Sequence, residues 1–273
     1  MLGADDTLAL TVSYDGSGFA GSQIQPGVRT VQEVLNAALA GLFGAPVPTV
    51  FAGRTDAGVS AAGQVVSCPD RRPDLAPETL RRALNARLPD DVAVVALARK
   101  PARFNARYDA VWREYRYRIW CGAEQPLARR CTWQRRSALD VAAMSAAGLR
   151  LVGEHDFAAF AGGGAGVPWS PRRQRPRGTR RRVLVCSCRP IAPWWGPVSG
   201  ELIEVRIVAD GFLPRMVRNI VGVLTEVGGG ARPAAWIDEL LAARDRRAGG
   251  TAAPARGMTL WRIGYGDERP ADA

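Results

Sequence analysis

Hydrophobic residues recur along this chain at two spacings, one typical of β-strands and the other of α-helices. In the first hundred residues they predict four strands, at residues 8–14, 47–51, 64–67 and 92–97, and two helices, at residues 31–43 and 78–88. The first helix has the clearest ends, because Thr30 and Glu33 have the spacing of a capping box and Gly44 follows the last apolar position. This part of the chain therefore has the order β-α-β-β-α-β.

Residues alternate most cleanly from Trp112 to Trp120, which predicts a strand. One face of that strand would carry Arg113, Tyr115, Tyr117 and Ile119, and the other Glu114, Arg116 and Arg118. Beyond it the pattern predicts a helix at 138–152 capped by Ser137, a polar loop at 162–182, strands at 183–188 and 202–208, helices at 215–227 and 236–243, and a strand at 258–265. The helix at 215–227 would turn five apolar residues inward, namely Met216, Val217, Ile220, Val221 and Leu224.

The second part of the chain thus repeats the order of the first, with one additional helix and a long loop. Two such orders in succession predict an α+β fold of two ferredoxin-like halves, residues 1–99 and 100–273. Their antiparallel sheets would meet at a central catalytic cleft. The halves share no sequence identity, so the repeat is topological. The commonest RNA-binding module has the same order, but its aromatic signature is absent from this sequence, and topology alone does not give function.

The stretch from Phe51 to Ala61 is polar and lies between two predicted strands. Gly53 and Gly58 can both adopt a positive φ, and between them stand Arg54 and Asp56. A tight loop of this composition can present a carboxylate to a ligand. The alternative is an ordinary turn, with a surface ion pair between the arginine and the aspartate.

The charge of the chain indicates what kind of partner it binds. The formal net charge is +11 and the sequence pI about 10.4, which favours a polyanionic partner such as a nucleic acid. Nearly all of the positive charge is arginine, since Lys100 is the single lysine.

Cysteine and histidine usage argues against a bound metal. The five cysteines have no CxxC spacing, and with His155 as the single histidine no zinc site is predicted. Free thiols in a reducing compartment are the better interpretation. The sequence has no apolar run of membrane-spanning length and no signal-peptide pattern at its start, so we expect a cytoplasmic protein.

Nine segments, in order over nearly the whole chain, resemble the tRNA pseudouridine synthase A family. They are Tyr14-Asp15-Gly16, Gln23 to Gln32, Gly53 to Val59, Leu84 to Pro89, Phe104 to Arg107, Arg113 with Tyr115 and Tyr117, His155 to Phe157, Met216 to Gly222, and Ala248 to Gly257. The resemblance implies a cofactor-free homodimer that isomerises uridine to pseudouridine at positions 38–40 in the anticodon arm of tRNA.

The resemblance also implies roles for individual residues. Asp56 would be the essential catalytic group, Tyr115 would pack against the flipped base, and Arg218 would pair with Asp56 and keep it ionised. Arg54 would contact phosphate or fill the gap left by the base. Further RNA contacts are expected at Arg107, Arg113 and Arg215.

Two positions depart from the pattern of the family. Ser60 stands where a histidine is usual, and Ser22 where a tryptophan is usual. Leu213 and Met258 are expected in the core or a pocket wall, and His155 is given no role. The arginine-rich segment 172–182 is either a patch that tracks an RNA backbone or a solvated insertion.

The chemistry can be argued without the resemblance. Uridine must leave the stack, break its N1–C1′ bond, turn over and rejoin through C5. A carboxylate can attack the sugar, attack the base or remove the C5 proton, and none of these steps needs a metal. A catalytically idle RNA-binding protein is the alternative function. An aspartic protease is a remote third, because it needs two Asp-Thr-Gly loops and this chain has Thr-Asp-Ala-Gly once.

Overall fold

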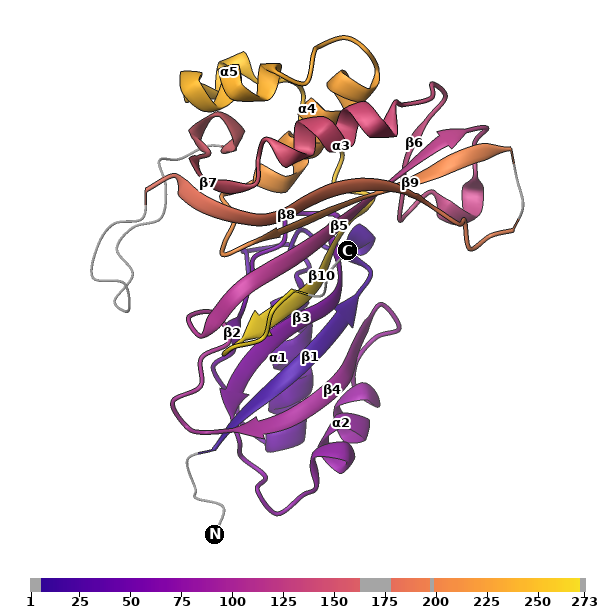
Figure 1. The fold of residues 1–273 in the computed structure, drawn as a ribbon. Coiled ribbons are helices and arrows are strands. Elements are labelled where there is room, and N and C mark those ends of the chain that lie inside the picture. The colour runs from indigo at the N-terminus through magenta and orange to yellow at the C-terminus, as the bar shows by residue number, and fades with distance from the viewer. Residues whose placement is uncertain (1–5, 163–177, 197–198, 271–273) are drawn as a thin grey trace. The chain divides into compact units, whose positions relative to one another are not determined.

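The computed structural model describes residues 6–162, 178–196 and 199–270. In these residues the chain is a mixed α+β protein with ten strands and five α-helices (Figure 1). It divides into two compact units: Met1–Val111 with Thr259–Glu268, and Trp112–Met258 with Arg269–Ala273.

The sheet of the first unit has the strand order β4-β1-β3-β10, and β2 pairs with β3. The strands are β1 (Thr7–Tyr14), β2 (Val50–Phe51), β3 (Ser60–Pro69), β4 (Val92–Lys100) and β10 (Met258–Tyr265). β1 runs antiparallel to both β3 and β4. β10 lies parallel to β3, with Thr259 opposite Ser60. The sequence pattern grouped this last strand with the second half, and in that respect the structure differs.

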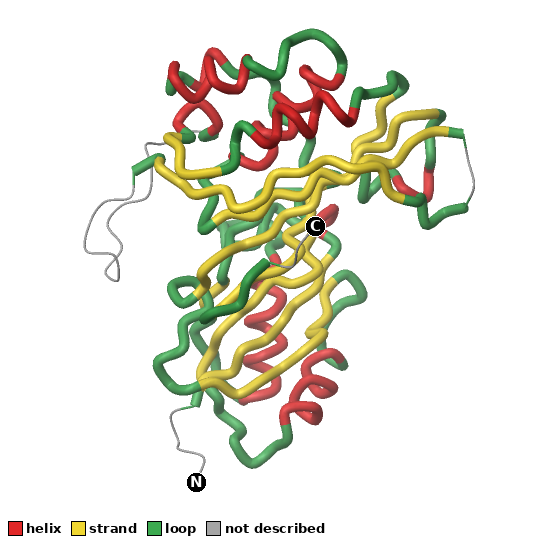
Figure 2. Tube along the Cα trace, viewed as in Figure 1, coloured by secondary structure: helices red, strands yellow, loops and turns green. Residues whose placement is uncertain are grey.

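The helices of the first unit are α1 (Val31–Phe43) and α2 (Pro77–Asn85). The predicted ends of α1 are confirmed: the Thr30 hydroxyl accepts from the backbone N of Glu33 at 3.4 Å, and Gly44 ends the helix with φ +74°. α2 ends earlier than predicted, at Asn85, whose side chain bonds both backbone groups of Val94 in β4. α1 lies across one face of the sheet (Figure 2).

The sheet of the second unit has the strand order β5-β9-β8-β7, and the short β6 pairs in parallel with β5. The strands are β5 (Ala110–Gly122), β6 (Trp133–Arg135), β7 (Gly153–Asp156), β8 (Arg180–Ile191) and β9 (Gly200–Ala209). β6 and β7 were not predicted. Among the described residues of both units there are also four short 3-10 helices, at Gly16–Gly18, Pro126–Ala128, Ala158–Phe160 and Arg246–Ala248.

The start of β8 corrects one prediction. Residues 180–182 were expected in a polar loop, but they form the first residues of this strand. Arg181 is 2% exposed, and its guanidinium donates to the carbonyl of Gly178 at 3.0 Å. At the end of the arginine-rich segment Arg181 is therefore packed, whereas Arg180 and Arg182 on either side of it are exposed. Its remaining part, residues 172–177, lies outside the described residues.

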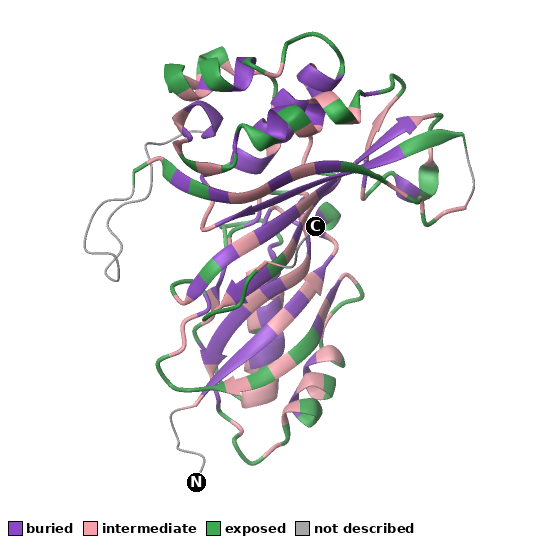
Figure 3. Cartoon of the chain, in the orientation of Figure 1, coloured by how far each residue is buried: buried purple, intermediate pink, exposed green. Residues whose placement is uncertain are grey.

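The helices of the second unit are α3 (Val141–Leu149), α4 (Met216–Gly228) and α5 (Trp236–Ala243). The predicted cap of α3 was wrong: Asp140, not Ser137, caps the helix by accepting from the backbone N of Ala143 at 2.9 Å. All five inward residues predicted for α4 are buried. α3 and α4 lie on one face of the sheet (Figure 1), and most residues of α4 are buried (Figure 3).

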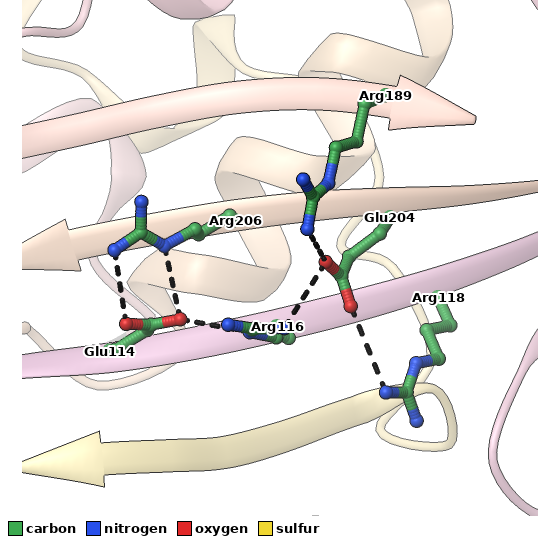
Figure 4. A network of polar contacts seen from close by, with 6 residues as sticks. All are labelled: Glu114, Arg116, Arg118, Arg189, Glu204 and Arg206. Atoms are coloured by element: carbon green, nitrogen blue, oxygen red, sulfur yellow. Dashed lines mark hydrogen bonds and ion pairs between the residues drawn. The ribbon is translucent and has the colours of Figure 1, made fainter. Parts of the chain in front are cut away.

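The opposite face of this sheet carries an ion-pair network that joins β5, β8 and β9 (Figure 4). Glu114 is 3% exposed and accepts two bonds from Arg206, at 3.0 and 3.2 Å, and one from Arg116 at 2.8 Å. Glu204 is 2% exposed and pairs with three arginines, namely Arg116 (3.4 Å), Arg189 (3.2 Å) and Arg118 (3.7 Å). The predicted division of β5 into a tyrosine face and a charged face is confirmed.

This network sets the protonation of the Glu114 carboxylate. Burial alone would raise the pKa of Glu114, but the hydrogen bonds from Arg206 and Arg116 outweigh it and hold the pKa below its ordinary value.

Among the described residues, no helix is both long and apolar enough to cross a membrane. All five cysteines are free thiols.

Candidate active site

Residues 52–59 connect β2 to β3 and carry both Arg54 and Asp56. The backbone N of Val59 donates to the carbonyl of Asp56 at 3.1 Å and closes a tight turn. Gly58 sits in this turn with φ +78°, as expected, whereas Gly53 does not adopt a positive φ. Gly53 is instead fixed by the Gln64 side chain, which accepts from its N at 3.2 Å and donates to its carbonyl at 2.7 Å. The loop is thus tied down at both ends.

Thr55, directly before Asp56, is bonded through every polar group that it has. Its N–H donates to the Ser22 hydroxyl at 2.9 Å, and its carbonyl accepts from the backbone N of Ser22 at 3.0 Å. Its hydroxyl lies 2.8 Å from the hydroxyl of Tyr14. Burial raises the pKa of Tyr14 to about 12, against the opposing effect of hydrogen bonds to Thr55 and Gln64, so this phenol stays neutral. We call Tyr14, Ser22 and Thr55 the Thr55 cradle.

A second set of contacts fastens the far side of the loop. The Ser60 hydroxyl accepts from the backbone N of Gly16 at 3.0 Å, and the N of Gly58 donates to the carbonyl of Phe19 at 3.3 Å. Gly16 lies so close that a Cβ there would stand 2.1 Å from the Val59 carbonyl oxygen. The serine at the usual histidine position therefore has a structural partner inside the protein.

Three of the predicted site residues lie in the first unit. Asp56 is half-buried, while Arg54 is exposed two residues before it. Arg107 is also exposed, and its guanidinium lies over the Tyr108 ring at 5.6 Å from the centroid. Its backbone N donates to the side chain of Asn105 at 3.0 Å, which fixes the turn that presents it.

In the second unit, β5 carries Arg113 and Tyr115 on the face expected from the sequence. Tyr115 is 5% exposed, and its ring meets that of Phe212 edge-on with centroids 5.0 Å apart. Arg113 is half-buried and donates to the carbonyl of Asp210 at 3.4 Å. The segment that follows β9 thus supports both residues.

The start of α4 carries the last two predicted residues. Arg215 is the exposed N-cap, with φ 58° and ψ 5°, a left-handed conformation that costs an L-residue about 1–2 kcal/mol. Strain of this kind is often kept at functional positions. Arg218 is half-buried and donates through Nε to the carbonyl of Ala253 at 2.7 Å. Leu213 and Met258 are buried, in keeping with core or wall positions.

Arg218 also lies near the hydroxyl of Tyr117, which donates to the Pro254 carbonyl at 2.9 Å. Burial raises the pKa of Tyr117, and the charges of Arg218 and Arg256 oppose the rise. The segment around Ala253 and Pro254 therefore holds one side chain from β5 and one from α4. Arg218 belongs to the second unit and Asp56 to the first, so their pairing stays a prediction.

The comparison with known proteins decides the family. A family model described as tRNA pseudouridine synthase matches residues 10–109 and 147–266. The chain belongs to the tRNA pseudouridine synthase A family. It is 42% identical over 260 residues to tRNA pseudouridine synthase A of Geobacillus kaustophilus, with 94% of this chain and 93% of that protein covered.

Two further relatives bear the same name. The one from Shouchella clausii is 42% identical over 261 residues and covers 95% of this chain and 93% of its own length. The one from Nitratidesulfovibrio vulgaris is 40% identical over 279 residues, with 94% and 99% covered. The enzyme is thus an isomerase that acts on uridine in tRNA.

The residues that sequence reasoning missed are those that hold the loop of this synthase. Tyr14 was noted only as part of a motif, Gln64 only as part of a strand, and Ser22 only as a departure. The available signal was a polar side chain at the end of one predicted strand (Tyr14), at the start of another (Gln64) and in the loop after the first (Ser22). Within the described residues, no three His, Cys, Asp or Glu side chains come close enough to hold a metal ion.

Proposed function

We propose that this synthase converts uridine to pseudouridine in the anticodon stem-loop of tRNA, at positions 38–40, with Asp56 as the catalytic carboxylate. The observation that carries the proposal is the loop itself. Asp56 is half-buried and follows a residue whose N–H, carbonyl and hydroxyl are all bonded. An ordinary surface turn would not need these three bonds at the preceding residue. They therefore favour a loop that presents the carboxylate over a surface turn with an ion pair.

The reaction needs one group of this kind. The N1–C1′ bond breaks, a C5–C1′ bond forms, and the C5 proton is transferred to solvent as N1 gains another, so the product is an isomer of the substrate. The nucleotide must first leave the stack, at a cost of a few kcal/mol. Asp56 would act by attack on C1′, by attack on the base, or by removal of the C5 proton.

Tyr115 and Arg218 would complete the catalytic group. The Tyr115 ring, braced edge-on by Phe212, would pack against the flipped base. Arg218 would pair with Asp56 and oppose the rise in pKa that an enclosed carboxylate otherwise suffers. As predicted from the sequence, residues 1–99 would then supply the Asp56 loop, and residues 100–273 would supply Tyr115 and Arg218. The two parts would be the ferredoxin-like halves on either side of the catalytic cleft.

The net charge of +11 supports the rest of the proposal. Exposed arginines at positions 54, 107 and 215 suit contacts with RNA phosphates, and half-buried Arg113 would be a fourth. We further propose that the enzyme works as a homodimer in the cytoplasm, without a cofactor.

Asp56→Asn tests the catalytic assignment. Tritium release from C5-labelled uridine in tRNA should fall more than about a hundredfold, because an essential acid, base or nucleophile is lost. Affinity for tRNA in filter binding should stay within about threefold, since it depends mainly on arginine–phosphate contacts. Asp74→Asn, at an exposed carboxylate of the same unit, is the matched control and should behave as wild type. An Asp56→Asn enzyme within about tenfold of the wild-type rate would rule out this role.

The tRNA position has its own test. Pseudouridine mapping of total tRNA from cells that lack the protein should show losses at positions 38–40. Losses at other positions would redirect the substrate assignment, and no loss at all would favour the idle RNA-binding alternative.

A further inference from the structure

Ser22 connects two elements that are far apart in the sequence. Its side chain is completely buried, with 0% exposure. Its carbonyl accepts from the backbone N of Gln32, in the first turn of α1, at 3.0 Å. On its other side it bonds both the N–H and the carbonyl of Thr55. The residue is therefore a rigid link between the start of α1 and the loop that carries Asp56.

The link limits how the loop can move. Thr55 cannot rotate its peptide planes without breaking a bond to Ser22, and its side chain is held by Tyr14 at 2.8 Å. The Asp56 carbonyl is bonded in turn by Val59 at 3.1 Å. With Thr55 held and the Asp56 carbonyl bonded, the backbone on both sides of the Asp56 Cα is fixed, which restricts where its carboxylate can point.

We propose that Ser22 is a positioning residue for catalysis, which aims the Asp56 carboxylate by holding Thr55. Ser22 stands where the family pattern has a tryptophan. An indole has a donor and no acceptor, so it cannot accept the N–H of Thr55 as the hydroxyl does. The bond from the Thr55 N–H therefore depends on the hydroxyl that this chain has at position 22. The inference rests on the proposed role of Asp56.

Ser22→Ala removes only the acceptor for the Thr55 N–H. We expect a fall in single-turnover rate at saturating tRNA of about tenfold to a hundredfold, because small misplacements of a reacting group cost this much. Affinity for tRNA should stay within about threefold, since the cradle is buried and makes no phosphate contact.

Ser67→Ala is the matched control for the loss of a buried hydroxyl. Ser67 is 4% exposed in the same unit, and its hydroxyl accepts from the backbone N of Ala106 at 3.1 Å. Both substitutions leave one buried N–H without its acceptor, so both should lower the melting temperature by a similar amount. A positioning role predicts that only Ser22→Ala slows the reaction, whereas a purely structural role predicts equal rates.

Tyr14→Phe provides an independent variant if Ser22→Ala does not fold. It keeps the ring and removes the hydroxyl bonded to Thr55, so it should slow catalysis in the same way. In the double variant with Ser22→Ala, the fold loss in rate should be smaller than the product of the two single losses, because both substitutions act through Thr55. In an Asp56→Asn background, Ser22→Ala should leave the residual rate unchanged.

The outcomes separate this inference from the proposed function. The positioning role is overturned if Ser22→Ala reacts within about threefold of the wild-type rate, or if Ser67→Ala slows the reaction equally. If Asp56→Asn is inactive in the same assay, the catalytic role of Asp56 still stands. An Asp56→Asn enzyme that keeps its activity overturns both.

Discussion

Removing the charge of Glu114 should destabilise the second unit severely. Its carboxylate accepts three hydrogen bonds from two arginines, and the Arg206 side chain is only 5% exposed. In Glu114→Gln the shape is kept, but an NH₂ group faces the guanidinium and the buried cation loses its two bonds to an ionised carboxylate. Breaking a buried pair from one side typically costs about 3–5 kcal/mol. Because Arg116 keeps its contact with Glu204, we take about 3 kcal/mol, the low end of this range.

At about 2–4 °C per kcal/mol for a unit of this size, the melting temperature should fall by about 6–12 °C. Circular dichroism or scanning calorimetry at pH 7 measures the shift. Asp74→Asn breaks the exposed pair with Arg72 and should cause no measurable change. Adding Arg206→Met to Glu114→Gln removes the buried cation that has lost its carboxylate bonds, so the double variant should be more stable than Glu114→Gln alone.

The pH dependence gives the same hypothesis a second test. The folded-state pKa of Glu114 is held below its ordinary value of 4.5. Its stabilising effect is therefore complete above about pH 4.5 and is lost as the pH falls through the folded-state pKa. The difference in melting temperature between wild type and Glu114→Gln should shrink over that interval. Two results together would refute this account of Glu114. The first is a small difference in melting temperature between wild type and Glu114→Gln that does not vary with pH. The second is that the effects of Glu114→Gln and Arg206→Met simply add.

Three further predictions concern the proposed site. Arg218→Met should move the acidic limb of the log kcat–pH profile upward by at least about one unit and slow the enzyme at pH 7, with part of the rate recovered at higher pH; an unmoved limb would argue against a pair with Asp56. The affinity for tRNA should fall steeply and linearly in a log–log titration with salt, and a flat plot would reject the electrostatic account. Gly16→Ala should inactivate the enzyme, because its Cβ would lie 2.1 Å from the Val59 oxygen, whereas Gly18→Ala, with its nearest neighbour at 3.4 Å, should stay active in the same tritium assay.

Local patterns in the sequence were enough to predict most elements of the fold. α1 begins after a hydroxyl cap and ends at a glycine, and both signals act within a few residues of the helix ends. β5 alternates because one of its faces packs on helices and the other carries the charged network. In both cases the information lies in the segment itself.

The predictions that were wrong depended on partners distant in sequence. Ser137 and Asp140 are both good helix caps, but the backbone N of Asp140 donates to the carbonyl of Gly228 at 2.8 Å, which places that residue at the start of α3. Arg181 looked like a solvated loop residue because its sequence does not show that β7 and β9 flank the strand.

The same limit applies to the candidate site. The motif around Asp56 was visible, since its residues are contiguous. The hydrogen bonds that hold this loop were not visible in the sequence, because the bond between Ser22 and Thr55 joins two loops separated by all of α1. Ser22 looked like a lost apolar anchor, and only its burial beside the Thr55 N–H shows it as a polar one.

The pairing of β10 with β3 has a consequence for the order of events during synthesis. Thr259 and Leu260 bond along Ser60 and Ala61, the first residues after the Asp56 loop. Until β10 has been synthesised, Ser60 and Ala61 lack this partner, because β2 pairs with β3 only farther along the strand, at Val66 and Ser67, and the first unit is incomplete. Nascent chains arrested before residue 258 should therefore leave the start of β3 without this partner beside the loop, and the enzyme can become active only after β10 has been synthesised.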